Sequence, residues 1–292
     1  MKILITGGTG FIGANLISKL YQKYDITALT RIGSNTEKIK GFCKIFSYDY
    51  QINHLISLFQ QECFDGVIHL ATHYQATHSS SDLTTICEAN ITLGTHLLES
   101  CRYHYPKFFI NTLTFSQFAN SKTYSPPSLY DATKQAFYDL ICFYQSQIPT
   151  LFSHLLLYNT YGPNDPRPKI FNLWQKYALS QEILEMSQGE QELDFSHIDD
   201  VINGFDLLIQ LILKNKIPKN TIHTLQNTRY QLRELADLYM SLTKTNINIK
   251  WGAKPYRSIE IFKPIGIPDL PILPEWKPKI SLQKGIQQIY GK

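Results

Sequence analysis

The opening stretch, MKILITGGTGFIGANLISKL, constrains the fold of this chain more than any other segment. Residues 3–5 form a short apolar run with β-branched character, typical of a strand that is buried on both faces. Apolar residues then recur at the spacing of one helix face, at Ile12, Leu16, Ile17 and Leu20. Three glycines stand at the turn from strand to helix, at Gly7, Gly10 and Gly13. The segment therefore predicts a strand, a tight turn and a helix.

The spacing of these glycines predicts a dinucleotide site. A turn this tight needs positive φ angles, and a pyrophosphate approaches backbone N–H groups only where no Cβ intervenes. The N-terminus of the following helix adds partial positive charge for the phosphates. An ordinary glycine-rich turn is the alternative, but the position after a buried strand is the context that the binding motif requires. We expect Gly7, Gly10, Phe11 and Ile12 to contact the cofactor.

Strands and helices alternate through the first half of the chain. Strands are predicted at 3–5, 26–29, 44–48, 66–71, 107–112 and 153–159, with helices between them, for example at 54–61 and 86–103. This alternation indicates an α/β fold, a Rossmann-type doubly wound parallel sheet with helices on both faces.

A glycine and several prolines after residue 161 predict a boundary between two domains. Residues 1–163, with a return near 195–225, are expected to form the dinucleotide-binding domain. Residues 164–292 are expected to form mainly a smaller α/β substrate domain. Helices are predicted near 169–180, 199–213 and 231–242, followed by a proline-rich tail and a last short helix.

Charge and cysteine content narrow the function classes. The net charge of +4 comes without a long Lys/Arg run, so nucleic acid is not indicated as a partner. The five cysteines are scattered without a CxxC pair, so neither a disulfide framework nor a metal site is predicted. No apolar run approaches the ~18 residues that span a membrane, and no signal peptide precedes the first strand. We therefore expect a cytoplasmic protein without a membrane partner.

The end of the second strand bears on the choice of cofactor. An NAD site usually carries Asp or Glu there, which accepts hydrogen bonds from the ribose 2′-OH. This chain has Thr30 and then Arg31. A guanidinium pairs with a 2′-phosphate, whereas a carboxylate repels it. The sequence thus favours NADP(H) over NAD(H), although a solvated loop arginine is the alternative for Arg31.

Tyr130 and Lys134 are candidates for proton transfer. They lie four apart in SLYDATKQAFYDLI, a segment with helical spacing, and so share one helix face. An ammonium beside the phenol would stabilise the phenolate and lower the tyrosine pKa toward neutrality, which asks for about 4 kcal/mol. Taken alone, the pair also fits a surface tyrosine beside a solvated lysine.

The order of these features resembles the extended short-chain dehydrogenase/reductase family, in particular its nucleotide-sugar epimerases, dehydratases and reductases. The resemblance runs nearly end to end. Its motifs are TGGTGFIG at 6–13, VIHLAT at 67–72, ANITLGTHLLES at 89–100, NTYGP at 159–163, DFSHIDDV at 194–201 and PEWKPKISLQKGI at 274–286. This combination favours the proton-transfer interpretation of Tyr130 and Lys134.

The resemblance implies three catalytic residues. Tyr130 matches the proton donor or acceptor, and Lys134 matches the residue that holds the nicotinamide ribose and lowers the tyrosine pKa. Thr112 falls where the family places the Ser or Thr that hydrogen-bonds the reacting oxygen, with Thr114 as the competing candidate. The pair of Asn111 and Thr112 aligns better with the usual Ser-Thr, so Thr112 is preferred.

The resemblance also implies binding residues. Besides those already named, the predicted cofactor contacts are Asp49, Tyr50, Leu70, Ala71, Thr72 and Tyr158. The predicted contacts with a nucleotide-sugar substrate are His73, Tyr74, Thr114, Asn159, Lys169 and Arg257. A homodimer through the helix of Tyr130 and the helix near 90–104 is also implied.

Departures from the family pattern narrow the reaction. The 4,6-dehydratases carry Asp-Glu after the catalytic Thr, where this chain has Leu113 and Thr114, so dehydration is not expected. Leu156 and Leu193 replace arginines that are common in the family, and the second replacement puts the usual diphosphate contact in doubt. Arg257, Lys169 and Arg167 are the candidates to compensate for it.

Three short sequence motifs are similar to those of the CDP-abequose and CDP-paratose synthases: HLAT-x-Tyr at 69–74, Asn-Thr at 111–112, and GEQ-x-x-Asp-Phe at 189–195. The implied function is NADPH-dependent reduction of the 4-keto group of a nucleotide-linked 4-keto-6-deoxy or 3,6-dideoxy hexose in deoxysugar and surface polysaccharide biosynthesis. The similarity to these synthases suggests CDP as the linked nucleotide. Two alternatives stay open: a 4-epimerase with tightly bound NAD, and a non-catalytic NADP-binding partner protein.

Overall fold

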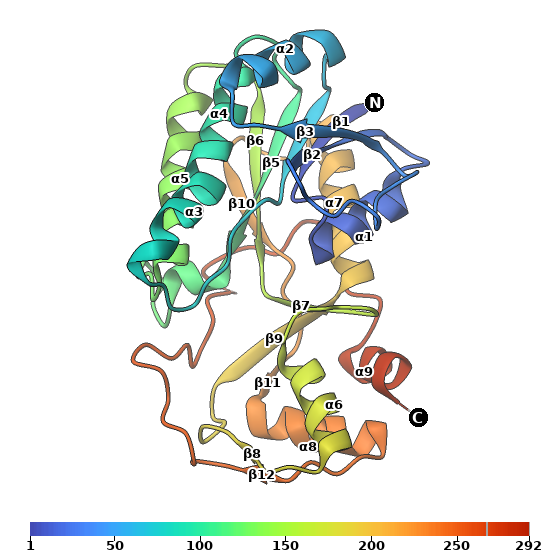
Figure 1. Cartoon of the computed structure of the whole chain (residues 1–292), viewed down its shortest axis with the longest axis vertical. Helices are drawn as coiled ribbons and strands as arrows, with labels where there is room; N and C mark the ends of the chain where they lie inside the picture. Colours follow the sequence, from blue (N-terminus) through green and yellow to red (C-terminus); the bar gives the residue numbers. More distant parts are fainter. Residues whose placement is uncertain (267, 292) are drawn as a thin grey trace.

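The computed structural model describes residues 1–266 and 268–291, and within them seven parallel strands form one large sheet (Figure 1). All neighbouring pairs in this sheet are parallel. Its order is β10 (Thr221–Thr224), β6 (Leu151–Leu157), β5 (Phe108–Thr114), β4 (Gly66–His69), β1 (Lys2–Thr6), β2 (Asp25–Arg31) and β3 (Lys44–Tyr48). The predicted Rossmann-type fold is confirmed, although β10 was not predicted.

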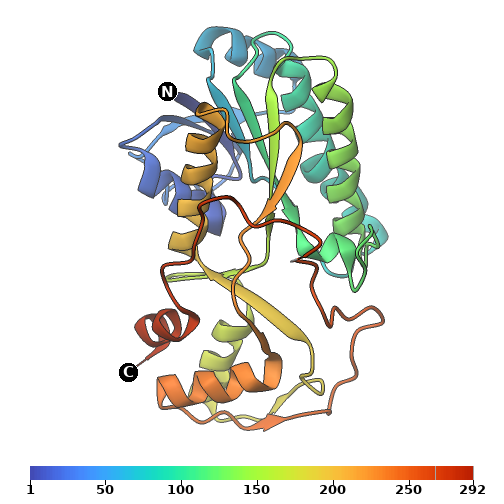
Figure 2. The ribbon, with the colours of Figure 1, turned by 180° about the vertical axis from the view of Figure 1, so that it is seen from behind.

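Helices cover both faces of the large sheet (Figures 1 and 2). One face carries α1 (Phe11–Leu20) and α7 (Ile198–Leu213), which pack on each other and on the sheet through one apolar core. The other face carries α2 (Ile52–Glu62), α3 (Leu83–Cys87), α4 (Leu93–Ser100) and α5 (Leu129–Gln145). A second core under these helices contains the fully buried rings of Phe59 and Phe137. Strand order reverses between β1 and β4, where such sheets bind ligands at the carboxyl ends of the strands.

The helix predicted over 86–103 is interrupted. A π-helical turn, η2 (Glu88–Thr92), separates α3 from α4, and α4 ends at Ser100. The extra residue of a π turn rotates the polar Asn90 into the interior, where it is 2% exposed and fully hydrogen-bonded. Apolar periodicity alone does not reveal such an insertion.

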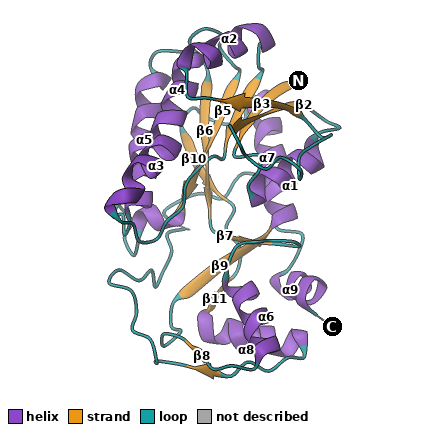
Figure 3. Cartoon of the chain, viewed as in Figure 1, coloured by secondary structure: helices purple, strands orange, loops and turns teal. Residues whose placement is uncertain are grey.

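A smaller layer lies beyond the carboxyl ends of the large sheet (Figures 1 and 3). Its three-stranded sheet has the order β11 (Arg229–Gln231), β9 (Glu192–His197) and β7 (Asn159–Tyr161). Helices α6 (Ile170–Ser180), α8 (Leu232–Thr243) and α9 (Leu282–Tyr290) surround it, and β8 (Leu184–Glu185) pairs with β12 (Ile249–Lys250) at its far end. An aromatic core fills it, with Phe171, Trp174, Phe195 and Tyr239 buried together. The predicted strand 153–159 is thus two strands in different sheets.

The chain passes between the two layers more than once. After β9 the chain crosses to the large sheet, where α7 packs on one face and β10 pairs with β6. The chain then returns to the smaller layer at β11. The boundary near residue 163 stays a prediction, because packing in two layers does not establish that either part folds alone. Within the described residues, no helix has the length and apolar character needed to cross a membrane.

Candidate functional site

The glycine turn after β1 is packed too closely for side chains at two of its positions. Gly7 has φ +69°, and a Cβ there would lie 2.7 Å from the backbone N of Ala71. A Cβ on Gly13 would lie 2.2 Å from the carbonyl oxygen of Gly7. Gly10 caps α1 with φ −76° and donates its N–H to Gly7 over 3.0 Å. Positive φ is therefore confirmed for Gly7 alone, and the turn is a backbone cradle at the start of α1, where Phe11 and Ile12 follow.

The residues predicted to contact the adenosine part of the cofactor lie together at the carboxyl ends of β2 and β3. Thr30 is buried, and its hydroxyl group has no hydrogen-bond partner among the described residues. Arg31 is exposed, and its charge acts on Tyr50, which has φ 64°. Asp49 accepts hydrogen bonds from the Gln51 N–H and from His54, and these hold its pKa below the usual range.

The segment after β4 is held by Asn90, which was not among the predicted site residues. Its side-chain oxygen accepts from the Thr72 hydroxyl (3.0 Å) and from the N–H of His73 (2.7 Å). Its amide donates to Thr133 Oγ1 over 2.9 Å, and Thr133 bonds the carbonyl of Tyr130. Asn90 thereby fixes the loop after β4 against α5. A lone amide inside an apolar helical pattern was the only signal for it in the sequence.

Tyr130 lies near the start of α5 and is 8% exposed. Burial raises its pKa above the usual range and the charge of Asp131 adds to this, while hydrogen bonds from Thr72 and Thr114 act in the opposite direction. The predicted net lowering of the tyrosine pKa is therefore wrong for the chain's own groups, because burial outweighs the threonine hydroxyls and Lys134 is not among the largest contributions.

Lys134 is a buried cation without a counterion. It is 3% exposed, and burial lowers its pKa to about 8. No hydrogen bond or ion pair reaches its ammonium from residues 1–266 or 268–291. Burial lowers the pKa of His69 and His154, two histidines of the sheet, and the charge of Lys134 also contributes to this lowering. An unpaired buried ammonium is costly for a protein unless a ligand supplies its partners.

The two candidate threonines of β5 differ in what they contact. The strand runs two residues beyond the predicted end and finishes at Thr114. Thr112 is buried within it and donates its hydroxyl to the His69 carbonyl over 3.2 Å. Thr114 lies at the carboxyl edge, caps the short helix η3 (Phe115–Phe118) and reaches the phenol of Tyr130. Thr114 thus lies at the carboxyl edge and acts on the pKa of Tyr130, whereas the hydroxyl group of Thr112 is engaged within the sheet. Which of the two contacts a reacting oxygen stays a prediction.

Several predicted substrate residues lie beside Tyr130. The ring of Tyr74, 55% exposed, meets that of Tyr130 edge-on at 5.0 Å, and Lys169 Nζ lies 4.8 Å from the Tyr74 ring centre. Burial lowers the pKa of Lys169, and the positive charges of Arg167 and Arg257 lower it further. Arg257 is exposed.

Other predicted binding residues are engaged within the protein. The Asn159 amide donates to the Asp194 carbonyl over 3.1 Å, and Tyr158 donates its hydroxyl to Ile265. His73 shares a 3.3 Å hydrogen bond with Gln75. Arg167, considered as a replacement for the missing arginines, is bound by the Asp165 carboxylate at 2.7 and 2.8 Å.

A strap over 257–271 runs along one side of the molecule, between the smaller layer and the large sheet (Figure 2). Asn120, which follows η3, donates to the Glu260 carbonyl over 2.5 Å and accepts from the N–H of Phe262 over 2.6 Å. Lys122 pairs with Asp269 over 2.9 Å. The turn that follows Thr114 thus anchors the strap; residue 267, within it, lies outside the described residues.

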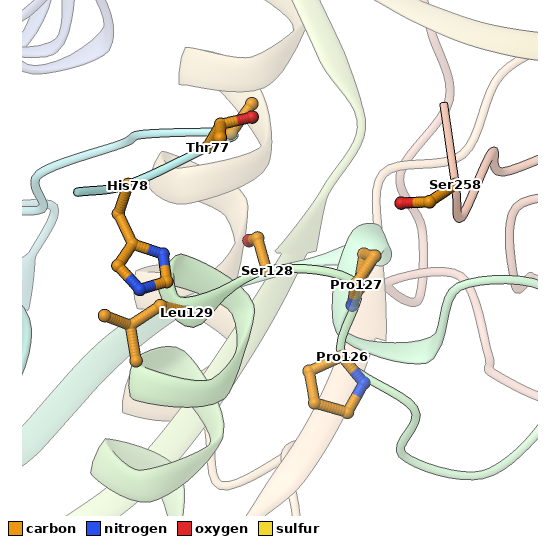
Figure 4. A pocket seen from close by; sticks show the side chains of 8 residues that line it. Thr77, His78, Pro126, Pro127, Ser128, Leu129 and Ser258 are labelled. Carbon is orange, nitrogen blue, oxygen red and sulfur yellow. The ribbon is translucent and has the colours of Figure 1, made fainter. Parts of the chain in front are cut away.

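A cavity of about 390 Å³ opens beside the start of α5 (Figure 4). The loops 76–78 and 126–129 line it, together with Ser258 of the strap. Ser128, the N-cap of α5, is among the lining residues, two positions before Tyr130.

The NAD dependent epimerase/dehydratase family matches residues 3–220, and the chain belongs to this family. It is therefore an enzyme of the short-chain dehydrogenase/reductase type, as predicted. CDP-abequose synthase from Yersinia pseudotuberculosis is 29% identical over 277 residues, covering 90% of this chain and 92% of that protein. CDP-abequose synthase from Salmonella muenchen is 26% identical over 293 residues, covering 99% and 96%. UDP-glucose 4-epimerase from Thermotoga maritima, solved with UDP-glucose, has the same fold with a TM-score of 0.85 at 22% identity, covering 99% and 97%.

Proposed function

We propose that the chain uses NADPH to reduce the 4-keto group of a nucleotide-linked deoxyhexose, with CDP as the nucleotide. The observation that carries this proposal is the position of the buried Lys134, which makes no ion pair within the described chain, one helical turn from the buried Tyr130 on α5. The match to CDP-abequose synthases over nearly the whole chain supports the substrate class. Deoxysugar formation for surface polysaccharide is the setting in which such a reductase works.

The residues present fit a dinucleotide cofactor. The Gly7–Gly13 turn leaves backbone space that a Cβ would fill, and the buried Thr30 hydroxyl has no partner in the described chain. Lys134 is 3% exposed, and none of the described residues forms a hydrogen bond or ion pair with its ammonium. Gly10 and Phe11 at the start of α1 would hold the pyrophosphate and Lys134 the nicotinamide ribose. The nicotinamide supplies the hydride, while the protein supplies placement and the proton.

Two side chains act on the reacting oxygen in this proposal. Tyr130 gives its proton to the oxygen that becomes an alkoxide, and a raised pKa keeps the phenol protonated until that charge develops. Thr114 orients the carbonyl, because its hydroxyl group lies at the phenol whereas that of Thr112 is bound to a backbone carbonyl. Leu113 is 3% exposed and cannot transfer a proton, which argues against dehydration.

The decisive experiment follows NADPH absorbance with a CDP-linked 4-keto-3,6-dideoxyhexose, and repeats it with NADH. Stoichiometric loss of NADPH, faster than that of NADH, supports the reductase. No loss, with NAD released when the protein is denatured, instead identifies the epimerase. No loss and no bound NAD contradicts both and leaves another sugar nucleotide or the non-catalytic partner protein.

Lys134→Met is expected to stabilise the free protein and abolish activity. Lowering the Lys134 pKa from 10.5 to about 8 costs roughly 3 kcal/mol of folding stability below pH 8. Because the unfolded chain binds more protons between pH 8 and 10.5, wild-type stability should rise across that window, and that of the variant should not. Urea unfolding at pH 7 and pH 10 measures both effects. A variant less stable than wild type at pH 7 contradicts the assignment.

Arg31→Asp is expected to reverse the cofactor preference. Losing a charged hydrogen bond to a 2′-phosphate costs about 1.5–3 kcal/mol, so kcat/KM for NADPH should fall roughly 10–100-fold while NADH gains relative to it. Lys219→Asp, at the opposite edge of the sheet beside β10, is the matched charge reversal and should leave the ratio unchanged. An unchanged NADPH/NADH ratio in Arg31→Asp would leave Arg31 as a solvated loop residue.

The homodimer stays part of this proposal. Phe143 on α5 is 58% exposed, and Tyr103 and Tyr105 after α4 are 50% and 53% exposed. Exposed aromatic rings on α5 and just beyond the end of α4, near the two helices that the family resemblance implicates, support pairing of two copies there.

A further inference from the structure

A chain of hydroxyl groups leads from the phenol of Tyr130 to a buried carboxylate with no role in the reaction described above. Hydrogen bonding by Thr114 lowers the pKa of the Tyr130 phenol, and Thr114 Oγ1 lies 2.8 Å from Ser116 Oγ. The Ser116 hydroxyl donates to Asp131 Oδ1. Asp131 directly follows Tyr130 in α5 and is only 3% exposed. The four side chains therefore connect the proton donor to an acid that lies next to it in sequence.

The number of hydroxyl protons fixes the direction of this chain. Each hydroxyl group has one proton to donate, and an ionised carboxylate accepts only. When Asp131 is ionised, the Ser116 proton points to it, so Thr114 must donate to Ser116. Thr114 then has no proton left for Tyr130 or a ligand and acts toward them as an acceptor.

The opposite direction requires a proton on Asp131. A protonated Asp131 donates to Ser116 Oγ, which turns its own proton to Thr114 Oγ1. The Thr114 proton is then free to point at the oxygen beside Tyr130. The hydroxyl groups only rotate in this change, and the one O–H bond that forms is that of the carboxyl group, with a proton from solvent.

Asp131 has a route to solvent and a neutralising environment. Ser128 donates to its Oδ2 over 2.5 Å and lines the cavity beside α5 (Figure 4). The titratable groups that feel its charge are Tyr130 and, from the preceding loop, Tyr124. Lys134, one turn further along α5, makes no ion pair with it within the described chain. Burial raises the pKa of Asp131 despite its hydrogen bonds from Ser116 and Ser128, which moves its titration toward neutral pH.

We propose that Asp131 is a positioning residue whose protonation state sets whether the Thr114 hydroxyl donates to the reacting oxygen or accepts from it. This inference rests on the proposed ketone reduction. A ketone oxygen has no proton and needs a donor, whereas the alcohol product has one and needs an acceptor. Protonated Asp131 thus favours ketone binding and reduction, and ionised Asp131 favours the alcohol.

The pH dependence of ketone reduction tests the proposal. Wild-type kcat/KM for the CDP-linked ketone should fall tenfold per pH unit above the ionisation of Asp131. Asp131→Asn and Ser116→Ala should both lose this decrease, because an amide donates at every pH and loss of Ser116 frees Thr114. Asp139→Asn, an exposed carboxylate on the same helix, is the control and should keep the wild-type profile. The same profile in all four proteins, with rates merely scaled, overturns the proposal.

A measurement without ligand separates this proposal from the function on which it rests. Urea midpoints are compared for Thr114→Val, Asp131→Asn and the double variant, first with Ser116 present and then with Ser116→Ala. The two changes should be non-additive with Ser116 and additive without it, because Ser116 carries the connection. Additivity in both backgrounds contradicts the hydroxyl chain. Non-additivity that needs Ser116, without NADPH oxidation by the wild type, contradicts only the proposed reaction.

Discussion

Tyr130→Phe is expected to lower turnover of the ketone by roughly 10²–10⁴-fold while leaving NADPH binding nearly unchanged. The change removes one oxygen atom from a residue that is 8% exposed and keeps the ring that packs against Tyr74. The proposed cofactor contacts lie mainly on the glycine turn and Lys134, so the loss should appear in kcat rather than in cofactor affinity. Steady-state kinetics and a fluorescence titration with NADPH measure the two quantities separately.

Tyr138→Phe is the matched control for this substitution. Tyr138 lies on the same helix, two turns beyond Tyr130, and its hydroxyl group contacts Asn220 at the start of β10, away from the site. Its variant should keep wild-type turnover. Full activity of Tyr130→Phe, or an equal loss in both variants, would remove Tyr130 from the reaction.

Gly13→Ala is expected to destabilise the protein and weaken cofactor binding about 100-fold. The added Cβ would lie 2.2 Å from the Gly7 carbonyl oxygen and 2.8 Å from the Gly8 Cα, both backbone atoms that cannot turn away. Relief of this clash opens the turn and moves N–H groups whose charge-assisted hydrogen bonds are worth about 1.5–3 kcal/mol each. Alanine gains up to about 1 kcal/mol in a helix, but overpacking costs about 1–3 kcal/mol.

Gly10→Ala is the control for the stability of Gly13→Ala. Its Cβ would lie 3.3 Å from the same carbonyl oxygen, and its φ of −76° suits any residue. Urea midpoints should therefore be close to wild type for Gly10→Ala and clearly lower for Gly13→Ala. Isothermal titration with NADPH measures the binding loss. Equal midpoints for the two variants would show that the turn is not packed as described.

Much of the fold was predictable because local patterns and tertiary packing agree in it. The first strand, the glycine turn and the helices around Tyr130 and after His197 follow from periodicity. The π turn around Asn90 was not predictable, because its cause is a set of hydrogen bonds to residues distant in the sequence. Strand β7 was missed because it has only three residues. Strand β9 was missed although it has six, because it lies in a small, mixed sheet and its sequence, ELDFSH, has no apolar run.

The site was only partly predictable for a similar reason. Thr112 and Thr114 point to the same side of one strand, so the choice between them depends on where the strand ends. Two further residues of β5 moved the edge of the sheet from Thr112 to Thr114. Tyr130 and Lys134 lie on one helix, as their spacing predicts, but the tyrosine pKa depends on burial, which spacing does not report.

The anchoring of the 257–271 strap by Asn120 has a consequence for how such enzymes diversify. The segment expected to contact the sugar is fastened to the turn that presents Thr114 and Ser116 to the proton donor. If the strap alone were replaced by that of a relative, its hydrogen bonds to Asn120 would be lost and the turn would be distorted. Transplants of substrate preference into this scaffold should therefore carry residues 114–122 and 257–271 as one cassette, and natural change in the two segments should be concerted.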